Sequence, residues 1–565
     1  SGSFVEDGNI TVLVSSLRKV LAEGETDGPY IQTVPKKGYR FTAGVKEAEH
    51  TKEGPVANDI KIATPVLTPT AGRPDWRRQI RILALALLVS VIGAAAYLRY
   101  IRLPAKRSLA VLPLQNLRHD PDTDFLGFSL ADAVITKLGL LSSITVRPSS
   151  AVERYKDHSV DLKRAAVELN VDTLLTGNFI GEGGHLRITY QLVDARASKI
   201  LVTDAIDLKY DQLLAVHDDV AKRIVNGLQL KLSPAEAERI KPDAPMNALA
   251  YEYYLRGVDL MGSHNFPLAV KMLEKSAEID PTYPLTWAFL GQSYTSDAAF
   301  QLGGREQYRR AQAAYERALA LQPKQIEAQM FLANLLVDTG RVEQAVPLLR
   351  DALAGNPNQA DVHWELGYAY RFAGMLKQSV AECERAWQID PMVQGNGAVL
   401  NSYLYLGQYD DFLRSLPPAN ESAFFRFYRG FGEYHQGHFA AATSDFDQAY
   451  RDGPTLYTGI GKAFADAIAG KNSDGLQMLR ELENKIRERG VGDAEATYKI
   501  AQGYAVLGDR VSGVSALRAS IENGFFPFPY LERDPLLNNL RGMPEFPKVL
   551  EIARQRYEVF KKRFF

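Results

Sequence analysis

Cysteine is almost absent from this sequence, which has a single one, Cys383, among 565 residues. One thiol can form neither an intramolecular disulfide nor a cysteine metal cage, so a disulfide-stabilised scaffold and a zinc finger are excluded. Net charge is also nearly absent, at −1, because 66 basic residues face 67 acidic ones. Any affinity for DNA therefore has to be local to one part of the chain. At about 150 residues per domain, this length predicts three or four domains.

Catalytic and metal-binding constellations are missing as well. The segment Asp120–Asp124 begins like a calcium loop, yet Phe125 stands where that loop needs glycine and Ala131 where it needs glutamate. His435 and His438 flank a turn without a third metal ligand close in sequence. We therefore expect a protein that is not an enzyme and that carries no cofactor and no metal.

A basic hairpin is predicted near the start of the chain. Tyr30–Val34 alternates large and small side chains as a half-buried strand does, and a proline then breaks the pattern. Lys36, Lys37 and Gly38 form a basic turn, in which the glycine can adopt positive φ. Arg40 points to the same side as the two lysines, where a phosphate backbone would lie.

An amphipathic helix is predicted upstream of the hairpin, over Asn9–Leu21. Its apolar positions recur at helical spacing, and Asn9 can cap its start. The opposite face carries short donors and two cations, which suit a helix lying in a major groove. These residues are Thr11, Ser15, Ser16, Arg18 and Lys19.

The helix and hairpin together resemble the last third of an OmpR/CadC-type winged-helix DNA-binding domain. The resemblance covers residues 4–43 and depends most on Leu17-Arg18 and on Gly38-Tyr39-Arg40-Phe41. It implies that the polar helix residues read promoter DNA and that Lys36, Lys37 and Arg40 contact the backbone as the wing. Many relatives have arginine where this chain has Ser15 or Ser16, so base preference does not transfer. The sequence begins inside this domain, which indicates either a fragment or a decayed module, and we favour a fragment.

A long apolar run, Ile82–Leu98, predicts one transmembrane helix over residues 80–101. Seventeen uncharged residues at about 1.5 Å each give about 25 Å, close to the ~30 Å bilayer core. A buried soluble helix is the alternative. Arginines flank both ends, so charge does not set the orientation. Because a DNA reader must meet DNA, we expect a single-pass protein of the bacterial inner membrane, with a cytoplasmic N-terminus and a periplasmic C-terminal region.

An α/β domain is predicted over residues 108–232. Buried or alternating strand patterns occupy Leu109–Leu114, Ile144–Val146, Thr173–Ile180 and Leu186–Asp194, and helical patterns occupy 129–141 and 213–228. The sequences Ala110-Val-Leu-Pro and Gln191-Leu-Val-Asp resemble the TolB amino-terminal-like domain, a resemblance that implies no chemistry.

A repeat array is predicted over residues 245–525, followed by a cap over 526–565. Pro323, Pro357 and Pro391 are spaced 34 residues apart, which is the period of tetratricopeptide repeats. In repeats of this kind the first helix lines a groove, so Asn334, Trp364, Tyr368 and Arg371 are the expected contacts with a protein or peptide ligand. The alternative is that these side chains only build the solenoid.

The expected fold class is therefore multidomain. It combines a partial α+β winged helix (residues 1–46), a flexible linker (47–79), one transmembrane helix, an α/β domain and an all-α tetratricopeptide solenoid. This order resembles the CadC/ToxR-like membrane-anchored transcriptional regulators, which implies promoter DNA as a partner and a homodimer on DNA. The alternative is an envelope interaction scaffold with an inactive DNA-binding remnant.

Overall fold

The computed structural model describes the following residues: 31–34, 38–41, 107–120, 122–156, 160–209, 216–240, 247–300, 304–390, 401–416, 422–489 and 493–565. The chain divides into two compact units, Ser1–Ile101 and Arg102–Phe565, which are described separately below.

The first unit contains the expected hairpin. Strands β1 (Ile31–Val34) and β2 (Gly38–Phe41) pair antiparallel, with Ile31 opposite Phe41 and Val34 opposite Gly38. This register confirms that the strand reverses between Val34 and Gly38, as the proline and the basic turn predict. The predicted helix Asn9–Leu21 lies outside the described residues, so the complete winged helix stays a prediction.

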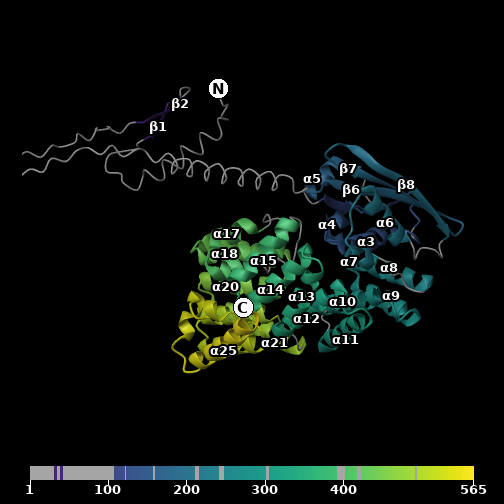
Figure 1. Ribbon diagram of the computed structural model, residues 1–565. Helices are drawn as coiled ribbons and strands as arrows, with labels where there is room; N and C mark the ends of the chain where they lie inside the picture. Colours follow the sequence, from purple (N-terminus) through teal and green to yellow (C-terminus); the bar gives the residue numbers. More distant parts are fainter. Residues whose placement is uncertain are drawn as a thin grey trace, which may run out of the picture. The chain divides into compact units, whose positions relative to one another are not determined.

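The second unit begins with a twisted sheet whose strand order is β5-β3-β6-β7-β8, with the short β4 also paired to β6. Its parallel part joins β3 to β5 and to β6, whereas β6, β7 and β8 form an antiparallel meander (Figure 1). The strands are β3 (Arg107–Val111), β4 (Gln115–Asn116), β5 (Ile144–Val146), β6 (Thr173–Glu182), β7 (His185–Asp194) and β8 (Lys199–Lys209).

Helices cover the inner face of this sheet. Along β7 the side chains of Leu186, Ile188, Tyr190 and Leu192 are buried, which is the alternation that its sequence predicts. The helices α3 and α6 pack against each other, and α3 also packs against β3 and β5. The helical elements are α3 (Leu126–Gly139), α4 (Ser149–Val152), η2 (Glu153–Tyr155), α5 (Leu162–Glu168), α6 (Val216–Gly227) and α7 (Pro234–Arg239).

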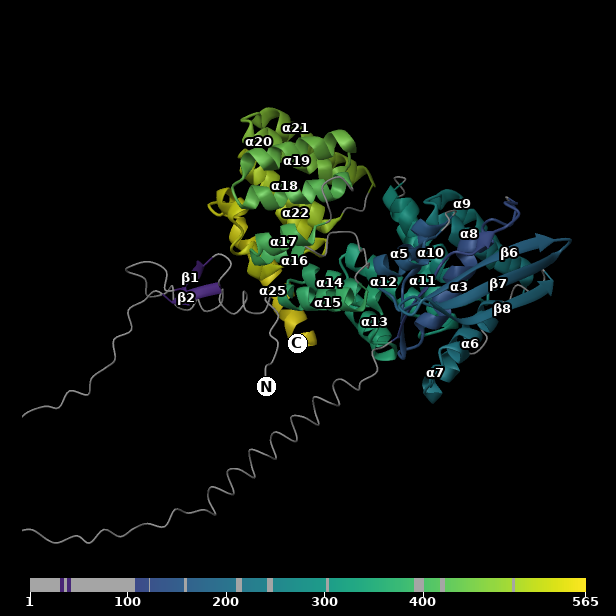
Figure 2. The same cartoon turned by 90° about the horizontal axis from the view of Figure 1, so that it is seen from above.

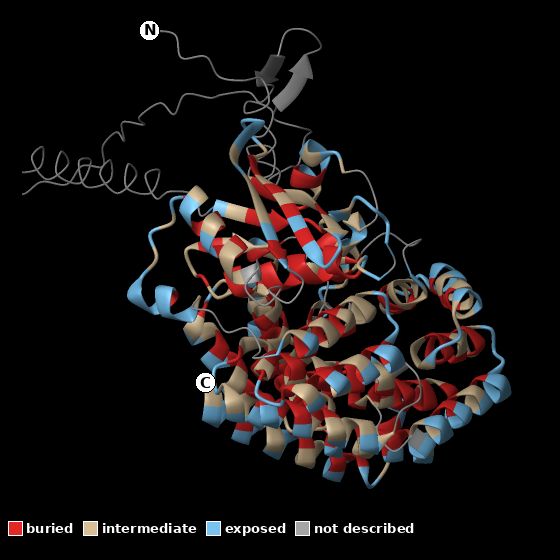
Figure 3. Ribbon diagram, turned by 90° about the vertical axis from the view of Figure 1, so that its right-hand side faces the viewer, coloured by how far each residue is buried: buried red, intermediate tan, exposed pale blue. Residues whose placement is uncertain are grey.

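The remainder is an array of antiparallel helix pairs, with apolar side chains buried between successive helices (Figures 2 and 3). The pairs are α8 (Ala248–Gly262) with α9 (Phe266–Ile279), α10 (Pro284–Phe300) with α11 (Arg305–Leu321), α12 (Ile326–Asp338) with α13 (Val342–Gly355), α14 (Ala360–Phe372) with α15 (Leu376–Ile389), α16 (Asn401–Leu406) with α17 (Tyr409–Ser415), α18 (Ala423–His435) with α19 (Phe439–Asp452), α20 (Leu456–Ile468) with α21 (Asn472–Arg489), and α22 (Ala494–Leu507) with α23 (Arg510–Glu522).

The turns inside these pairs repeat with the period that the prolines predict. Gly340 ends the turn after α12 and Gly374 the turn after α14, both with φ of 80°. Only glycine adopts this left-handed conformation without strain, so it terminates the first helix and lets the second one pack back. The 34-residue spacing of the two glycines places them at the same position of successive repeats.

The end of the array folds back onto its middle repeats. The cap consists of α24 (Phe528–Leu531), η5 (Pro535–Leu540) and α25 (Phe546–Phe564). The backbone N–H of Phe526 donates to the carbonyl of Phe372 at 2.9 Å, and Arg556 donates to the carbonyl of Gly340 at 3.1 Å. These bonds join segments about 150 and 216 residues apart, so the second half of the array is closed onto the turns of α12–α13 and α14–α15.

The prediction of a transmembrane helix, and with it the single-pass inner-membrane placement, requires correction. Among the residues that the structure describes, no helix is long and apolar enough to cross a bilayer. The long helices α21 and α25 carry charged side chains along their length, which a bilayer core disfavours. The run Ile82–Leu98, from which the prediction came, lies outside the described residues.

Candidate partner-binding site in the repeat array

Two of the four expected groove residues connect neighbouring first helices of the array. The amide of Asn334 on α12 donates to Glu365 on α14 at 2.9 Å. The hydroxyl of Tyr368 on α14 donates to Asp338, the last residue of α12, at 2.6 Å. The side chains of Asn334, Asp338, Glu365 and Tyr368 are only partly buried, and α12 lies beside α14 (Figure 2). The structure therefore brings Asn334 and Tyr368 together in one polar patch.

The carboxyl groups of this patch were missed by the sequence analysis. Asp338, Asp361 and Glu365 form what we call the α12–α14 carboxyl cluster. Burial is the main cause that raises the pKa of Asp338 and of Glu365 to about 7 and that of Asp361 to about 6. The charge of Asp338 raises the pKa of Glu365 further, as like charges at short range do.

Spacing in the sequence could have revealed the cluster. Asn334 and Asp338 are four residues apart on α12, and Asp361 and Glu365 are four apart on α14. Polar residues at this spacing share one helix face, and both helices are otherwise rich in buried apolar residues. The prediction favoured aromatic and arginine residues and overlooked these two polar pairs.

Groups on other elements also act on the cluster. Tyr308 of α11 and Asp493, just before α22, both face Asp338, and the negative charge of Asp493 raises the pKa of Asp338. Arg371 opposes them by lowering the pKa of Asp338 and of Glu365, but it is a smaller influence than burial. Asp338 and Glu365 are thus partly protonated near neutral pH, and a cation placed beside the cluster would favour the charged carboxylates.

Arg371 itself is not a groove residue in this structure. Its side chain has no exposed surface and forms an ion pair with Glu495 of α22 at 2.8 Å. Glu495 also accepts hydrogen bonds from Asn401 at 2.8 Å and from the hydroxyl of Tyr405. The prediction placed Arg371 in the groove, whereas the guanidinium is buried and paired with Glu495 of α22.

Trp364 is also placed in the interior. It is 5% exposed and packs against Trp387 of α15, with ring centroids 5.7 Å apart, and near the buried Cys383. Burial raises the pKa of the Cys383 thiol, so this side chain behaves as a small apolar residue. Trp364 thus fills the space between α14 and α15 and offers no face to a partner.

Side chains of the calcium-like loop and of His438 are bonded to other protein groups. In the calcium-like loop, Asn116 donates to Asp124 at 2.6 Å, and the backbone of Asp122 donates to Asp120 at 3.1 Å. His438 pairs with Glu433 at 2.7 Å. No group of three or more potential metal ligands occurs within the part of the chain that the structure describes.

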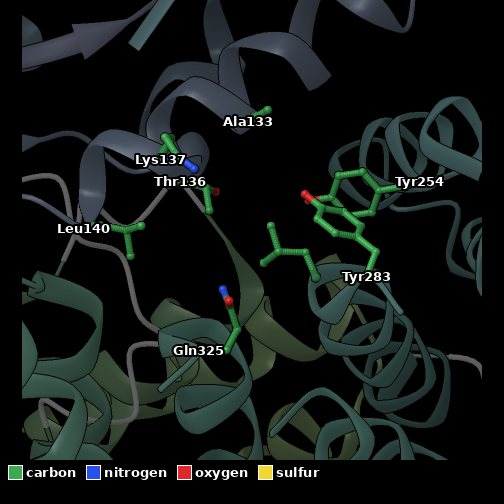
Figure 4. A pocket seen from close by; sticks show the side chains of 8 residues that line it. Ala133, Thr136, Lys137, Leu140, Tyr254, Tyr283 and Gln325 are labelled. Carbon is green, nitrogen blue, oxygen red and sulfur yellow. The ribbon is translucent and has the colours of Figure 1, made fainter. Parts of the chain in front are cut away.

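A recess lies at the junction of α3 with the first repeats. Figure 4 shows its lining side chains: Ala133, Thr136, Lys137, Leu140, Tyr254, Tyr283, Leu285 and Gln325. Lys137 pairs there with Asp218 at 2.9 Å. These residues come from both sides of the junction, so the recess belongs to the packing between the α/β domain and the array.

Of the expected DNA contacts, Arg40 lies on β2 opposite Gln32 of β1. The other seven are outside the described residues: Thr11, Ser15, Ser16, Arg18, Lys19, Lys36 and Lys37. Their roles stay predictions.

Comparison with known families matches two stretches of the second unit. Residues 105–226 match the second domain of HilA/YgeH-like transcriptional regulators, and residues 304–363 match the tetratricopeptide repeat family. The first match covers the α/β domain that the sequence analysis likened to a TolB amino-terminal domain. The chain therefore contains a domain of a transcriptional-regulator type and tetratricopeptide repeats.

Curated relatives are similar over shorter stretches. A Rhizobium meliloti protein named for an adenylate cyclase activity is 29% identical over 206 residues, which are 36% of this chain and 35% of that protein. The cholera toxin transcriptional activator of Vibrio cholerae is 39% identical over 61 residues, 10% of this chain and 21% of its own. The chain thus spans about a third or less of these relatives.

Solved repeat proteins align with the chain at low similarity. A protein of Thermus thermophilus has 15% identity and a TM-score of 0.24, covering 40% of this chain and 99% of its own. One from Parabacteroides merdae has 14% identity and a TM-score of 0.22, covering 54% and 98%. The repeat assignment depends on the helix pairs and the family match, and these alignments add no argument to it.

Proposed function

We propose that this protein is a transcriptional regulator that binds promoter DNA through its N-terminal part and a protein or peptide partner through its repeat array. The observation that carries the proposal is the match of residues 105–226 to a regulator domain in the same compact unit as the repeats. Similarity to the cholera toxin transcriptional activator, whose name denotes the same kind of role, supports it.

DNA recognition is proposed for the residues around the β1–β2 hairpin. Lys36, Lys37 and Arg40 would contact the phosphate backbone, and the polar face of the helix Asn9–Leu21 would read bases. The antiparallel pairing of β1 with β2 supports the wing, because a wing is a hairpin of this kind. Two such domains on adjacent half-sites would make the DNA-bound form a homodimer.

Partner recognition is proposed for the α12–α14 carboxyl cluster together with Asn334 and Tyr368. Three carboxyl groups on one face suit a partner segment that carries lysine or arginine. Because a bound cation favours the ionised carboxylates, the partner should bind more tightly as pH rises from about 6 to about 8.

A role without catalysis is proposed as well. The Rhizobium meliloti relative is named for an adenylate cyclase activity, and the shared stretch covers only 35% of it. Incubation of the purified chain with ATP and Mg²⁺ should therefore give no cyclic AMP. Turnover above a no-protein control would contradict this part of the proposal.

The regulatory role can be tested in cells without knowledge of the target promoter. Transcripts are compared in a strain that lacks the gene, complemented with the natural gene or with a triple variant, Lys36→Ala, Lys37→Ala and Arg40→Ala. We expect the natural gene to restore the transcript levels that change on deletion, and the triple variant to fail at equal protein abundance. If the triple variant restores them equally, the protein acts as an interaction scaffold and the regulator proposal is wrong.

A further inference from the structure

The α/β domain is joined to the repeat array by a buried arginine. Arg147, directly after β5, donates to the carbonyls of Leu169 at 2.6 Å and Asn170 at 2.7 Å within its own domain. It also donates to the carbonyl of Ile389, at the end of α15, at 2.6 Å and pairs with Asp390 at 3.2 Å. The two charged side chains are 3% and 1% exposed, so the pair is shielded from water.

A second set of bonds joins the loop before α14 to the end of α3. The amides of Asn356 and Gln359 each donate to the carbonyl of Gly139 at 2.6 Å, and Asn358 donates to that of Ser142 at 2.7 Å. The last carbonyls of a helix lack partners inside the helix. Side chains of the array therefore satisfy the C-terminal end of a helix in the α/β domain.

This interface fixes one relative position of the two parts. Each bond has a defined direction, and a shift of a few ångströms would leave a buried guanidinium or carbonyl without a partner. Loss of such partners costs more than loss of apolar contact alone. The arrangement therefore favours a joined or a separated state over a sliding contact.

The helix α14 connects this interface to the candidate partner site. The loop that carries Asn356, Asn358 and Gln359 leads directly into α14, and Asp361 and Glu365 lie on its first turns. Asp390 is close enough to Asp361 for its charge to raise the pKa of that carboxyl. A cation bound at the carboxyl cluster would therefore contact α14, the helix that follows the interface loop. Its charge would also act on Asp390, which belongs to the interface.

We infer that Arg147, Asp390, Asn356, Asn358 and Gln359 form a latch that holds the α/β domain on the repeat array and transmits the occupancy of the α12–α14 carboxyl cluster to the end of α3. The holding role depends only on the bonds above. The transmitting role rests on the proposed function, because it requires a partner at the cluster.

The holding role is tested with a nearly isosteric change in the full chain. Asn356→Asp with Asn358→Asp keeps the size of both side chains but replaces each amide, which donates to a carbonyl, by a carboxylate, which can only accept. Asn247→Asp is the matched control, because the side-chain oxygen of Asn247 accepts hydrogen bonds from the backbone of Leu249 and Ala250 and an aspartate can accept the same two bonds. We expect amide hydrogen exchange over residues 139–143 to rise at least tenfold in the double variant and to stay unchanged in the control.

Exchange over β6 and β7 serves as the internal reference for folding. If those strands also lose protection, Gln359→Ala replaces the double variant, because it removes only one bond to Gly139. With this variant a threefold rise over residues 139–143 is expected. Unchanged exchange there, in variants whose β6 and β7 remain protected, would show that the latch does not hold the domain.

The transmitting role is tested with a ten-residue polylysine peptide at pH 8 as the probe. In the natural chain, saturating peptide should change exchange over residues 139–143 at least threefold. In the double variant the peptide should bind with a Kd within a factor of two but leave that exchange unaltered. Binding without any change in the natural chain overturns transmission. Absence of binding contradicts the proposed partner chemistry and removes the transmitting role, while the variants alone still decide the holding role.

Discussion

Replacement of Arg371 should destabilise the repeat array strongly. The guanidinium has no exposed surface and joins α14 to Glu495 on α22, 124 residues further along the chain. In Arg371→Met the carboxylate of Glu495 stays buried among Asn401 and Tyr405 without its cationic partner. Removal of one member of a buried ion pair costs about 3–5 kcal/mol of unfolding free energy.

The expected change is large enough for thermal unfolding to detect. At about 2–4 °C per kcal/mol for a structure of this size, the Tm should fall by on the order of 10 °C. Arg385→Met on the neighbouring α15 is the matched control, because Arg385 is exposed and bonds to Gln388 on the surface of its own helix. Its Tm should change by less than about 2 °C, as surface substitutions usually do.

A double-mutant cycle separates the ion pair from general loss of packing. The variant Arg371→Met with Glu495→Met should lose less stability than the sum of the two single variants, by roughly 1–3 kcal/mol. A Tm of Arg371→Met equal to that of the natural chain would refute the burial argument. Arg371 would then again be a candidate contact with a partner in the groove. Strict additivity would show that the two side chains are not coupled.

Three further predictions follow from the same structure. In the completed winged-helix domain, replacement of Lys36, Lys37 and Arg40 by alanine should weaken DNA binding similarly for all sequences and reduce the slope of log K against log salt by about one per lost phosphate contact, measured by titration; an unaltered slope would argue against the wing. Because the pKa of Glu365 is raised to about 7, the folded protein holds a proton that the unfolded chain has lost, so stability should fall as pH rises from about 4.5 to about 7. Denaturant titrations should show a shallower fall in Glu365→Gln, and equal slopes would contradict this pKa. Trp364→Ala should cost about 3–5 kcal/mol of stability, because it empties a space between α14 and α15; an unaltered Tm would place this side chain at the surface.

Local sequence patterns predicted much of the fold. The strand patterns in Thr173–Ile180 and Leu186–Asp194 indicated β6 and β7, and prolines at 34-residue spacing indicated the phase of the helix pairs. The basic turn at Lys36 indicated the reversal between β1 and β2. These features depend on neighbours within a few residues, or on a period, and both are visible in one sequence.

The features that the sequence analysis missed depend on distant contacts. β8 extends the meander, yet its sequence mixes charged and apolar residues and lacks a clean alternation. Arg371 is paired with Glu495, 124 residues further along the chain, and the bonds of Arg147 span 242 residues to Ile389. Nothing near these arginines in the sequence distinguishes them from surface arginines. The carboxyl cluster could have been predicted from the helical spacing of its polar residues. The prediction instead chose aromatic residues on the same helices, and one of them, Trp364, lies in the core.

Selection of DNA from a random-sequence library by the product of the full-length natural gene, with its winged-helix domain complete, tests the central claim most directly. We predict that bound DNA becomes enriched in one motif, present as two half-sites, and that the triple variant of Lys36, Lys37 and Arg40 enriches none. Recovery of no motif by the natural chain, at a salt concentration where the protein is folded and binds the lysine peptide, would contradict its proposed role as a DNA-binding regulator.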